Sequence, residues 1–506
     1  YSQHQIIQSF FYDQPRRSQR RAMHRSAAEY YEVEEPDLFL ETFHNAKAEE
    51  FGRVARLIYA HVIIMMNLGR GKALQQAIQP IDIGKTDLSA EQRLAFLIGR
   101  GQLLTLLGEL DESETDLQLA ANMLNTLPQT AATDQLKAEV CLAMGQLLER
   151  QDPPKALEWA ERGLKFIPPR EQKLPVQLHL LAGMLNMYMG NFGAALESLQ
   201  VALDDLPAAS SGNLKVDIMN NLGATYWFMG QLDVANRFTS QALELSRLGR
   251  DHHLTAQVLL NSGPIKYLSG DWPGAIEALT EGLDIAERLG NHSDAVGISI
   301  NLGACHLNSG NDDEAQFFLE KSLSMMDGKS TALEITAQIR LGELHYHLRQ
   351  FEPALKFLEK AEALAAPIND QRSPALLYAI RSDILTSMGQ NEDGMHWANQ
   401  AITQSKMIGD NFSLGIARRC LGRNHVQRSE WELARSELEK SIQAFAEEGP
   451  HQIAISQIEM ARLEHLIGRQ SEALMLLQTA HATCSALGAV RELKKIEKMR
   501  HDLNLQ

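Results

Sequence analysis

Small, apolar and turn-forming residues recur along the chain at steps of 39 to 41 residues. The stretches NLGATYWFMGQLDVA, NSGPIKYLSGDWPGA and NLGACHLNSGNDDEA begin at Asn221, Asn261 and Asn301. Each has a small anchor residue, a turn residue seven positions later and an alanine twelve positions later. The anchors along the chain are Gly101, Gly183, Gly223, Gly263, Gly303, Gly342, Ser382, Gly422 and Ala461, and Met144 fills the gap between Gly101 and Gly183 less cleanly.

This pattern predicts pairs of helices that stack on copies of themselves. Small residues at fixed places on two successive helices let the two backbones approach closely, and a glycine ends the first helix by adopting a left-handed conformation. Leu, Ala, Glu and Gln are abundant, which favours helix, and no alternating β-branched run indicates a sheet. We therefore expect an all-α fold in which each repeat contacts its neighbours.

The small anchor, the aromatic or histidine residue three positions later, the glycine at seven and the alanines at twelve and nineteen resemble the tetratricopeptide repeat. The longer spacing and the scarcity of the closing proline resemble its 40-residue subclass, which occurs in kinesin light chains, bacterial peptide-sensing regulators and the sensor arms of large signalling ATPases. The resemblance implies a superhelical solenoid of about eleven helix pairs over residues 49–488, with a capping helix at 489–506.

One stripe of each first helix points away from its partner helix. At 100° per residue, the position two before the anchor lies about 160° from it, and the positions one and five after the anchor fall on the same side. In a tetratricopeptide solenoid this stripe lines the concave groove. The candidate groove residues are Asn221, Asn261, Asn301, Asn308, Arg340, Glu343, His347, Asp383 and Arg423, with the aromatic residues Trp227, Phe228, Tyr267 and Tyr346 on or beside the stripe.

Two interpretations of the stripe stay open. An Asn amide both donates and accepts, so a row of such amides can bind the main chain of an extended peptide. Alternatively, Asn tolerates a solvated helix face and repeats there by duplication, and the aromatic residues belong to the core.

Composition narrows the function classes. The net charge of −16 argues against contact between the array and a phosphate backbone. Four widely spaced cysteines indicate neither a disulfide framework nor a zinc site and favour a cytoplasmic location. No apolar run is long enough for a membrane span. No nucleophile is paired with a base, so we expect neither an enzyme nor a bound cofactor in this chain.

Residues 1–48 do not fit the repeat. The phrase formed by Arg21, His24, Ala28 and Glu32 resembles one found in STAND ATPases, including large ATP-binding LuxR-type regulators, where it closes the module after the ATPase. The resemblance implies that residues 1–48 are the tail of a preceding helical or winged-helix module, with an ATPase domain upstream. Phe10, Phe11, Tyr12 and Tyr30 would then have packed against that module.

The expected function is that of a bacterial sensor arm which binds a peptide or protein partner in its groove and reports occupancy to an effector domain. The rival interpretation is a passive adaptor or assembly scaffold without an attached ATPase. Monomeric and oligomeric forms are both compatible with the sequence.

Overall fold

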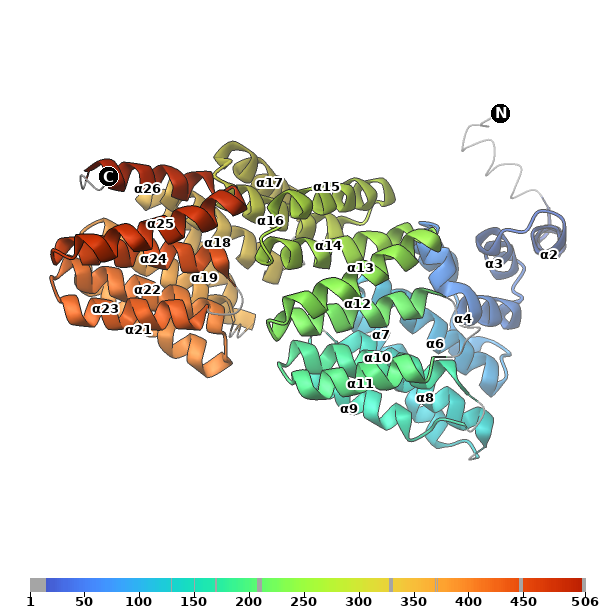
Figure 1. Ribbon diagram of the computed structural model, residues 1–506. Coiled ribbons are helices and arrows are strands. Elements are labelled where there is room, and N and C mark those ends of the chain that lie inside the picture. Colours follow the sequence, from blue (N-terminus) through green and yellow to red (C-terminus); the bar gives the residue numbers. More distant parts are fainter. Residues whose placement is uncertain are drawn as a thin grey trace. The chain divides into compact units, whose positions relative to one another are not determined.

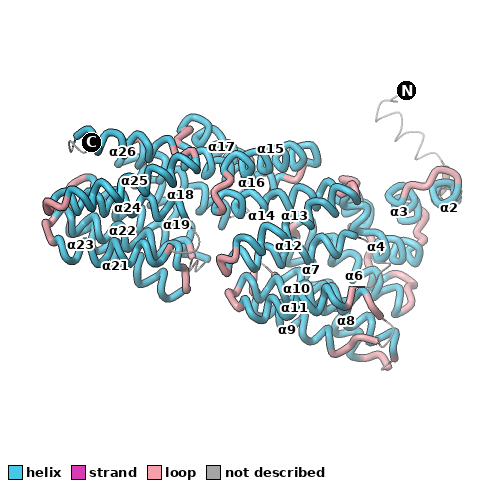
Figure 2. The backbone as a smooth tube through the Cα atoms, viewed as in Figure 1, coloured by secondary structure: helices cyan, strands magenta, loops and turns pink. Residues whose placement is uncertain are grey.

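The computed structural model describes residues 15–128, 130–149, 151–168, 171–206, 212–326, 331–368, 370, 372–445 and 449–502. Helices form all the regular structure in these ranges, and they contain no strand (Figure 2). The predicted all-α, tetratricopeptide-like solenoid is confirmed. None of the described helices has both the length and the apolar run needed to cross a bilayer.

The chain divides into two compact units, unit 1 (Tyr1–Ser210) and unit 2 (Ser211–Gln506). The helices of unit 1 are α2 (Arg17–Val33), α3 (Leu38–Lys47), α4 (Phe51–Asn67), α5 (Gly71–Ile78), the 3-10 helix η1 (Ile83–Lys85), α6 (Ala90–Leu107), α7 (Leu110–Asn125), α8 (Ala131–Leu148), α9 (Pro153–Leu164), α10 (Lys173–Tyr188) and α11 (Phe192–Asp204). The predicted boundaries at residues 48 and 488 stay predictions.

Unit 2 begins with α12 and ends with α26 (Figure 1). Its helices are α12 (Gly212–Phe228), α13 (Leu232–Leu248), α14 (His252–Leu268), α15 (Trp272–Leu289), α16 (His292–Ser309), α17 (Asp312–Ser324), α18 (Thr331–His347), α19 (Phe351–Ala365), the 3-10 helix η2 (Ala366–Ile368), α20 (Ser373–Ser387), α21 (Asn391–Ile408), α22 (Asn411–Gln427), α23 (Trp431–Ala444), α24 (Pro450–Leu466), α25 (Gln470–Leu487) and α26 (Val490–Asp502). The even-numbered helices α12 to α24 are the first helices of the pairs, and each packs on the odd-numbered helix that follows it.

The two helices of each pair approach most closely at the anchor residue. A methyl group built on Gly183 of α10 would lie 2.6 Å from Leu199 Cγ and 3.3 Å from the Ala195 carbonyl oxygen of α11. Where the anchor is Ser382, its hydroxyl donates to the Gly394 carbonyl oxygen at 2.7 Å. The small anchors therefore face the partner helix, as the pattern predicted.

One anchor was assigned wrongly. A methyl group on Gly145 of α8 would lie 3.3 Å from the Ala156 carbonyl oxygen of α9, which is the contact that the other anchors make. Met144, the residue that the spacing indicated, is buried beside it. The segment between anchor and alanine is one residue shorter in this pair, so counting along the chain missed the anchor by one position.

The turn between the two helices needs a residue with positive φ. Glycine provides it in most pairs, for example at Gly230 with φ of 77°. Arg349 and Ser429 occupy the same position in their pairs and adopt φ of 59°, although a side chain in this conformation costs about 1–2 kcal/mol. The helix packing on both sides of the turn thus imposes the backbone conformation even without glycine.

The early and late helix pairs of unit 2 contact one another. Trp272 at the start of α15 is 2% exposed and packs edge-on against His451 of α24, with ring centroids 4.9 Å apart. A methyl group on Gly270 would lie 2.7 Å from Leu487 at the end of α25. Ile496 of α26 is fully buried in the same cluster as Trp272. The early and late helix pairs of unit 2 are therefore in direct contact, and the sequence pattern did not reveal this contact.

The close approach at the anchors can be tested with two Gly-to-Ala changes. We expect Gly183→Ala to lower the free energy of unfolding by about 1–3 kcal/mol, because its new methyl group overlaps Leu199. Gly193→Ala in α11 is the control, since no atom lies within 4 Å of its new methyl group. Helix propensity alone should make it neutral or stabilising by up to about 1 kcal/mol. Urea unfolding measures both values, and equal values would remove the packing argument.

Candidate functional site

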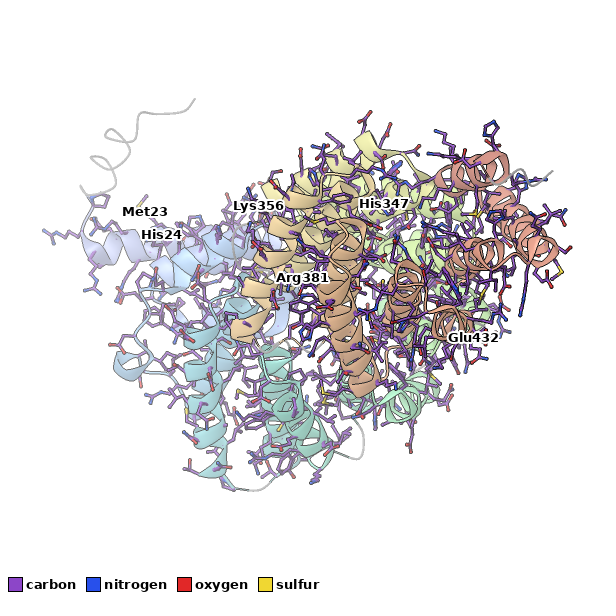
Figure 3. All side chains as sticks on the ribbon, turned by 90° about the vertical axis from the view of Figure 1, so that its left-hand side faces the viewer. Met23, His24, His347, Lys356, Arg381 and Glu432 are labelled. Carbon is purple, nitrogen blue, oxygen red and sulfur yellow. The ribbon has the colours of Figure 1, made fainter. Side chains whose placement is uncertain are left out.

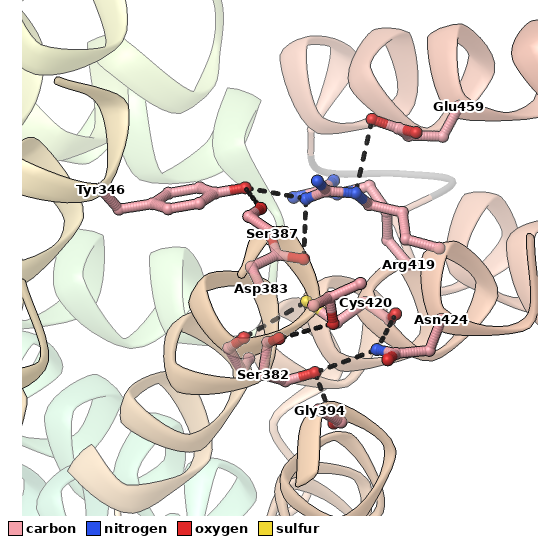
Figure 4. Close-up of polar contacts among 12 residues, drawn as sticks. Tyr346, Ser382, Asp383, Ser387, Gly394, Arg419, Cys420, Asn424 and Glu459 are labelled. Atoms are coloured by element: carbon pink, nitrogen blue, oxygen red, sulfur yellow. Dashed lines mark hydrogen bonds and ion pairs between the residues drawn. The ribbon is translucent and has the colours of Figure 1, made fainter. Parts of the chain in front are cut away.

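The candidate site is the inner face of unit 2, which we define as the stripe positions of the first helices together with the side chains that contact them. Its centre is the guanidinium group of Arg423 in α22. This group donates to the Tyr346 hydroxyl at 3.0 Å and forms ion pairs with Asp383 at 2.8 Å and Glu459 at 3.7 Å. Figure 4 shows Tyr346, Asp383 and Glu459 converging from α18, α20 and α24. Residues 77 positions apart thus meet in one polar cluster.

These side chains are partly screened from water but still in contact with it. The side chain of Arg423 is 21% exposed and that of Asp383 is 14% exposed. Arg340 and Glu343 on α18 form a second ion pair at 2.7 Å, with exposures of 24% and 20%. The inner face is consequently a polar lining of intermediate accessibility, unlike the apolar core between the helices of each pair.

His347 lies at the end of α18 and is labelled in Figure 3. Burial lowers its pKa well below the ordinary value, and the positive charges of Arg491, Lys495 and Arg423 lower it further. His347 is therefore neutral at neutral pH. Its nearby charges include side chains of α26, which the sequence analysis had placed in a separate cap.

The asparagine side chains of the stripe differ in their contacts. The Asn221 amide donates to the Asp217 carbonyl oxygen at 2.8 Å, and the Asn308 amide makes the same type of bond with Ala304. The Asn261 amide instead donates to Asn220 on the neighbouring first helix at 3.1 Å. Within the described parts of the chain, the Asn301 side chain has no hydrogen bond and is half-buried. The four amides thus keep different numbers of donors and acceptors for a ligand.

The aromatic candidates divide into two kinds. Trp227 and Phe228 contact each other with ring centroids 4.7 Å apart, and Phe228 is 39% exposed. Tyr267 stacks on Trp272 with centroids 5.3 Å apart, where it supports the closure of unit 2. Tyr346 is tied to Arg423 and lies 3.4 Å from the Ser387 hydroxyl. Of these four residues Phe228 is the most exposed, and the guanidinium carbon of Arg372 lies 5.7 Å from the centroid of its ring.

Several residues of the inner face were not predicted from the sequence. Glu459 occupies the position two before the anchor Ala461, so extending the stripe by one repeat would have found it. Glu492, Arg491 and Lys495 belong to α26, which follows no repeat pattern. Their contacts depend on the closure of unit 2 and carry no signal in the spacing.

Asp217 also lies on the inner side of α12, one helical turn before Asn221. Burial, reinforced by the negative charge of Asp251, raises the pKa of Asp217 to about 7. The folded chain therefore holds a proton on this carboxyl group at pH values where the unfolded chain has lost it.

Cysteines and clusters of possible metal ligands are further kinds of candidate site. The four cysteines are free and buried. Burial raises the pKa of the Cys305 thiol to about 12 and that of Cys141 to about 11, so both stay protonated. Within the described ranges, no group of three or more His, Cys, Asp or Glu side chains could hold a metal ion.

The four residues of α2 that resemble the STAND phrase form a packing face in unit 1. Arg21 pairs with Glu49, His24 lies 2.8 Å from His44 between Nδ1 atoms, Ala28 is fully buried, and Glu32 pairs with Arg53 at 3.3 Å. The spacing of the phrase is therefore the spacing at which α2 contacts the next helices. Tyr30 is 47% exposed, whereas Phe10, Phe11 and Tyr12 lie outside the described residues.

Comparisons with known proteins agree with this geometry. Residues 214–288, which span α12 to α15, match the tetratricopeptide repeat family. The crystal structure of the apo form of RapI aligns with a TM-score of 0.50 and 14% identity, covering 69% of this chain and 97% of that chain. The APC/C hetero-tetramer Cut9–Hcn1 aligns with a TM-score of 0.50 and 12% identity, covering 94% of this chain and 93% of that chain.

No curated protein sequence matches this chain. The class defined by the fold and the matches is a tetratricopeptide-like helical repeat solenoid. At these identities the structural similarities establish the fold alone. The partner of this chain has to be inferred from its own side chains.

The Arg423 cluster predicts a large difference between two arginine variants. Arg423→Met leaves two carboxylates without their cation in a partly desolvated place, and we expect a loss of about 2–3 kcal/mol in the free energy of unfolding. Arg288→Met removes the pair with Asp284, whose side chains are 68% and 67% exposed, and should cost less than about 1 kcal/mol. Urea unfolding of both variants measures the difference, which vanishes if the inner face is fully solvated.

Asp217 predicts a specific dependence of stability on pH. Because its folded pKa is raised above the unfolded value, the folded state binds more protons between about pH 4 and 7. The free energy of unfolding should fall as pH rises through this window, by at most about 1.4 kcal/mol per pH unit from this group. Asp217→Asn should remove this contribution to the slope of the free energy of unfolding against pH. Asp233→Asn, at an exposed position of α13, should leave the slope unchanged. Urea titrations at pH 5.5 and 8 compare the slopes, and an unchanged slope in Asp217→Asn would contradict the assignment.

Proposed function

We propose that this chain is a non-catalytic recognition module that binds a peptide or protein partner on the inner face of unit 2. The observation that supports it most directly is the convergence of Arg423, Asp383 and Glu459 from three successive first helices. Packing does not need these charges, since a partly buried ion pair contributes little to stability compared with apolar residues of similar size. A recognition surface does need them, because charged and amide groups of intermediate exposure give orientation and specificity to a bound chain.

The proposed recognition uses three kinds of group. Asn301 provides both a donor and an acceptor for a peptide main chain. The exposed ring of Phe228 provides an apolar contact at the start of the stripe. The ion pairs centred on Arg423 and Arg340 provide both positive and negative charges. A bound partner can therefore contact them without leaving desolvated charges of only one sign at the site. If the asparagines are only solvated surface, their replacement does not affect the binding of a partner. The variants described below distinguish this role from the binding role.

We further propose that the module is the sensor arm of a larger cytoplasmic signalling protein, as the resemblance of the α2 phrase to STAND ATPases implies. Binding would then shift the array between two arrangements, which requires that the partner prefers one of them. The packing of the same phrase residues on α3 and α4 gives a purely structural reason for their spacing. A phosphate-binding loop encoded upstream of Tyr1 would support the sensor arm.

The second candidate is an assembly scaffold. It is favoured by the similarity to Cut9, which is found in a hetero-tetramer with Hcn1 and covers 94% of this chain. A scaffold binds its partner constantly and needs no second arrangement of the array. An upstream region without a phosphate-binding loop would favour this candidate.

The binding site can be tested with a displayed library of random peptides selected on the whole chain. We expect the variant with Asn221, Asn261 and Asn301 all changed to Ala to bind the selected peptides several-fold more weakly or worse, since each lost hydrogen bond is worth about 0.5–1.5 kcal/mol net. Its folding should lose only about 1 kcal/mol, mainly through the bond between Asn261 and Asn220.

Asn399→Ala on the outer helix α21 is the matched control. The Asn399 amide donates to the Met395 carbonyl oxygen four residues earlier, as the Asn221 amide does to Asp217. This variant removes the same type of bond away from the inner face and should leave peptide affinity unchanged. If the triple variant folds and binds like the native chain, the asparagines are solvated surface and the proposed site is wrong.

A further inference from the structure

Helix α26 is held to unit 2 by few contacts. Only Glu492 and Ile496 are buried, the fewest for any described α-helix of unit 2, whereas α24 buries eight residues. Leu493 and Met499 are partly buried against the same apolar cluster. A helix with so little buried area contributes little of the hydrophobic free energy that stabilises the unit.

The first residues of α26 make polar contacts with α17 and α24. Arg491 pairs with Asp312 at the start of α17, and its side chain is 15% exposed. Glu492 Oε2 lies 3.3 Å from His451 Nε2 on α24. The main chain at Arg491 also lies against Gly310, since a methyl group built there would be 3.5 Å from Arg491 N. We call the surface formed by Asp312, Gly310, His451 and the apolar cluster around Ile496 the α26 docking site.

The charges of the helix and of its docking site are complementary. The sequence of α26, VRELKKIEKMRHD, has five Lys and Arg residues against three Asp and Glu residues, in a chain whose net charge is −16. The first turn of α17 carries Asp312, Asp313 and Glu314. A basic amphipathic helix placed against an acidic helix start is an arrangement that a helix from another protein can reproduce.

The chain connection explains why such a weakly held helix stays bound. Only Gly488 and Ala489 separate α25 from α26. A connection this short keeps the effective concentration of α26 at its docking site in the millimolar range or higher. Low intrinsic affinity is then enough for occupancy, and a partner helix of higher affinity can still displace α26.

We propose that the α26 docking site is a binding site for a basic amphipathic helix of a partner protein, and that α26 occupies it within the chain until the partner displaces it. The partner helix carries an Arg or Lys for Asp312 and an aliphatic residue five positions later, as Arg491 and Ile496 do. Displacement of α26 also removes Arg491 and Lys495 from the surroundings of His347, so it changes the inner face. This proposal rests on the proposed recognition function and names the class of its partner.

The test uses the whole chain and a fluorescent peptide with the sequence of residues 488–502. Ile496→Asp in the chain places a charge in the apolar cluster and should release α26, because an unpaired buried charge is strongly unfavourable. We expect the peptide to bind this variant at least tenfold more tightly than it binds the native chain, measured by fluorescence anisotropy. Equal affinities for the two chains would overturn the proposal.

Two further variants test the recognition of the basic residue. In the Ile496→Asp background, Asp312→Asn should weaken peptide binding several-fold, because it removes the partner of the peptide arginine. Asp313→Asn changes the charge equally one residue away, at an exposed position, and should weaken binding less than twofold. Equal effects of the two variants would mean that the peptide senses only the general charge.

If Ile496→Asp prevents folding, judged by loss of a cooperative thermal transition, Arg491→Glu replaces it. This change repels Asp312 while leaving the apolar contacts, and it should raise peptide affinity and the hydrogen exchange of α26. No gain in either measurement would overturn the proposal. If the peptide fails to bind while library peptides still depend on the inner-face asparagines, this inference fails and the proposed function stands.

Discussion

The close approach of two helices at each small anchor residue is the constraint on which the rest of the structure depends. At Gly183 the space for one methyl group is already taken by Leu199, and the glycine anchors of other pairs, such as Gly303 and Gly342, make the same contact. This contact fixes the distance and the angle between the two helices. Each following pair is then related to the previous one by nearly the same rotation and translation. Arg349 and Ser429 show how strong this constraint is, because they adopt the left-handed turn without being glycine.

Repetition of one offset has a long-range consequence in unit 2. The accumulated curvature brings Trp272 of α15 against His451 of α24. The curvature also brings stripe residues of successive first helices together, so that Arg423 is surrounded by three acceptors. A polar surface that would be ordinary on an open helix thus becomes a place where charges are costly to leave unpaired.

Closure also connects regions that would be independent in an open solenoid. His347 experiences the charges of Arg491 and Lys495 although α18 and α26 are separated by more than a hundred residues. If both proposed sites bind partners, occupancy of the α26 docking site changes the charges around His347 on the inner face. Under the proposed function, such a link gives the solenoid a way to respond to a partner.

The sequence by itself determined the helix pairs, their turns and the orientation of the stripe, because these depend on residues within one repeat. It predicted Arg340, Glu343, Asp383 and Arg423 at stripe positions counted from each anchor, and it located the anchors except for Gly145, where a shortened segment shifted the count. Tertiary structure alone decided which stripe residues meet, that Tyr267 supports Trp272, and that α26 contributes Glu492 to the interior. These contacts join residues from distant repeats. Their positions follow from the sum of many small rotations between repeats, which no local spacing records.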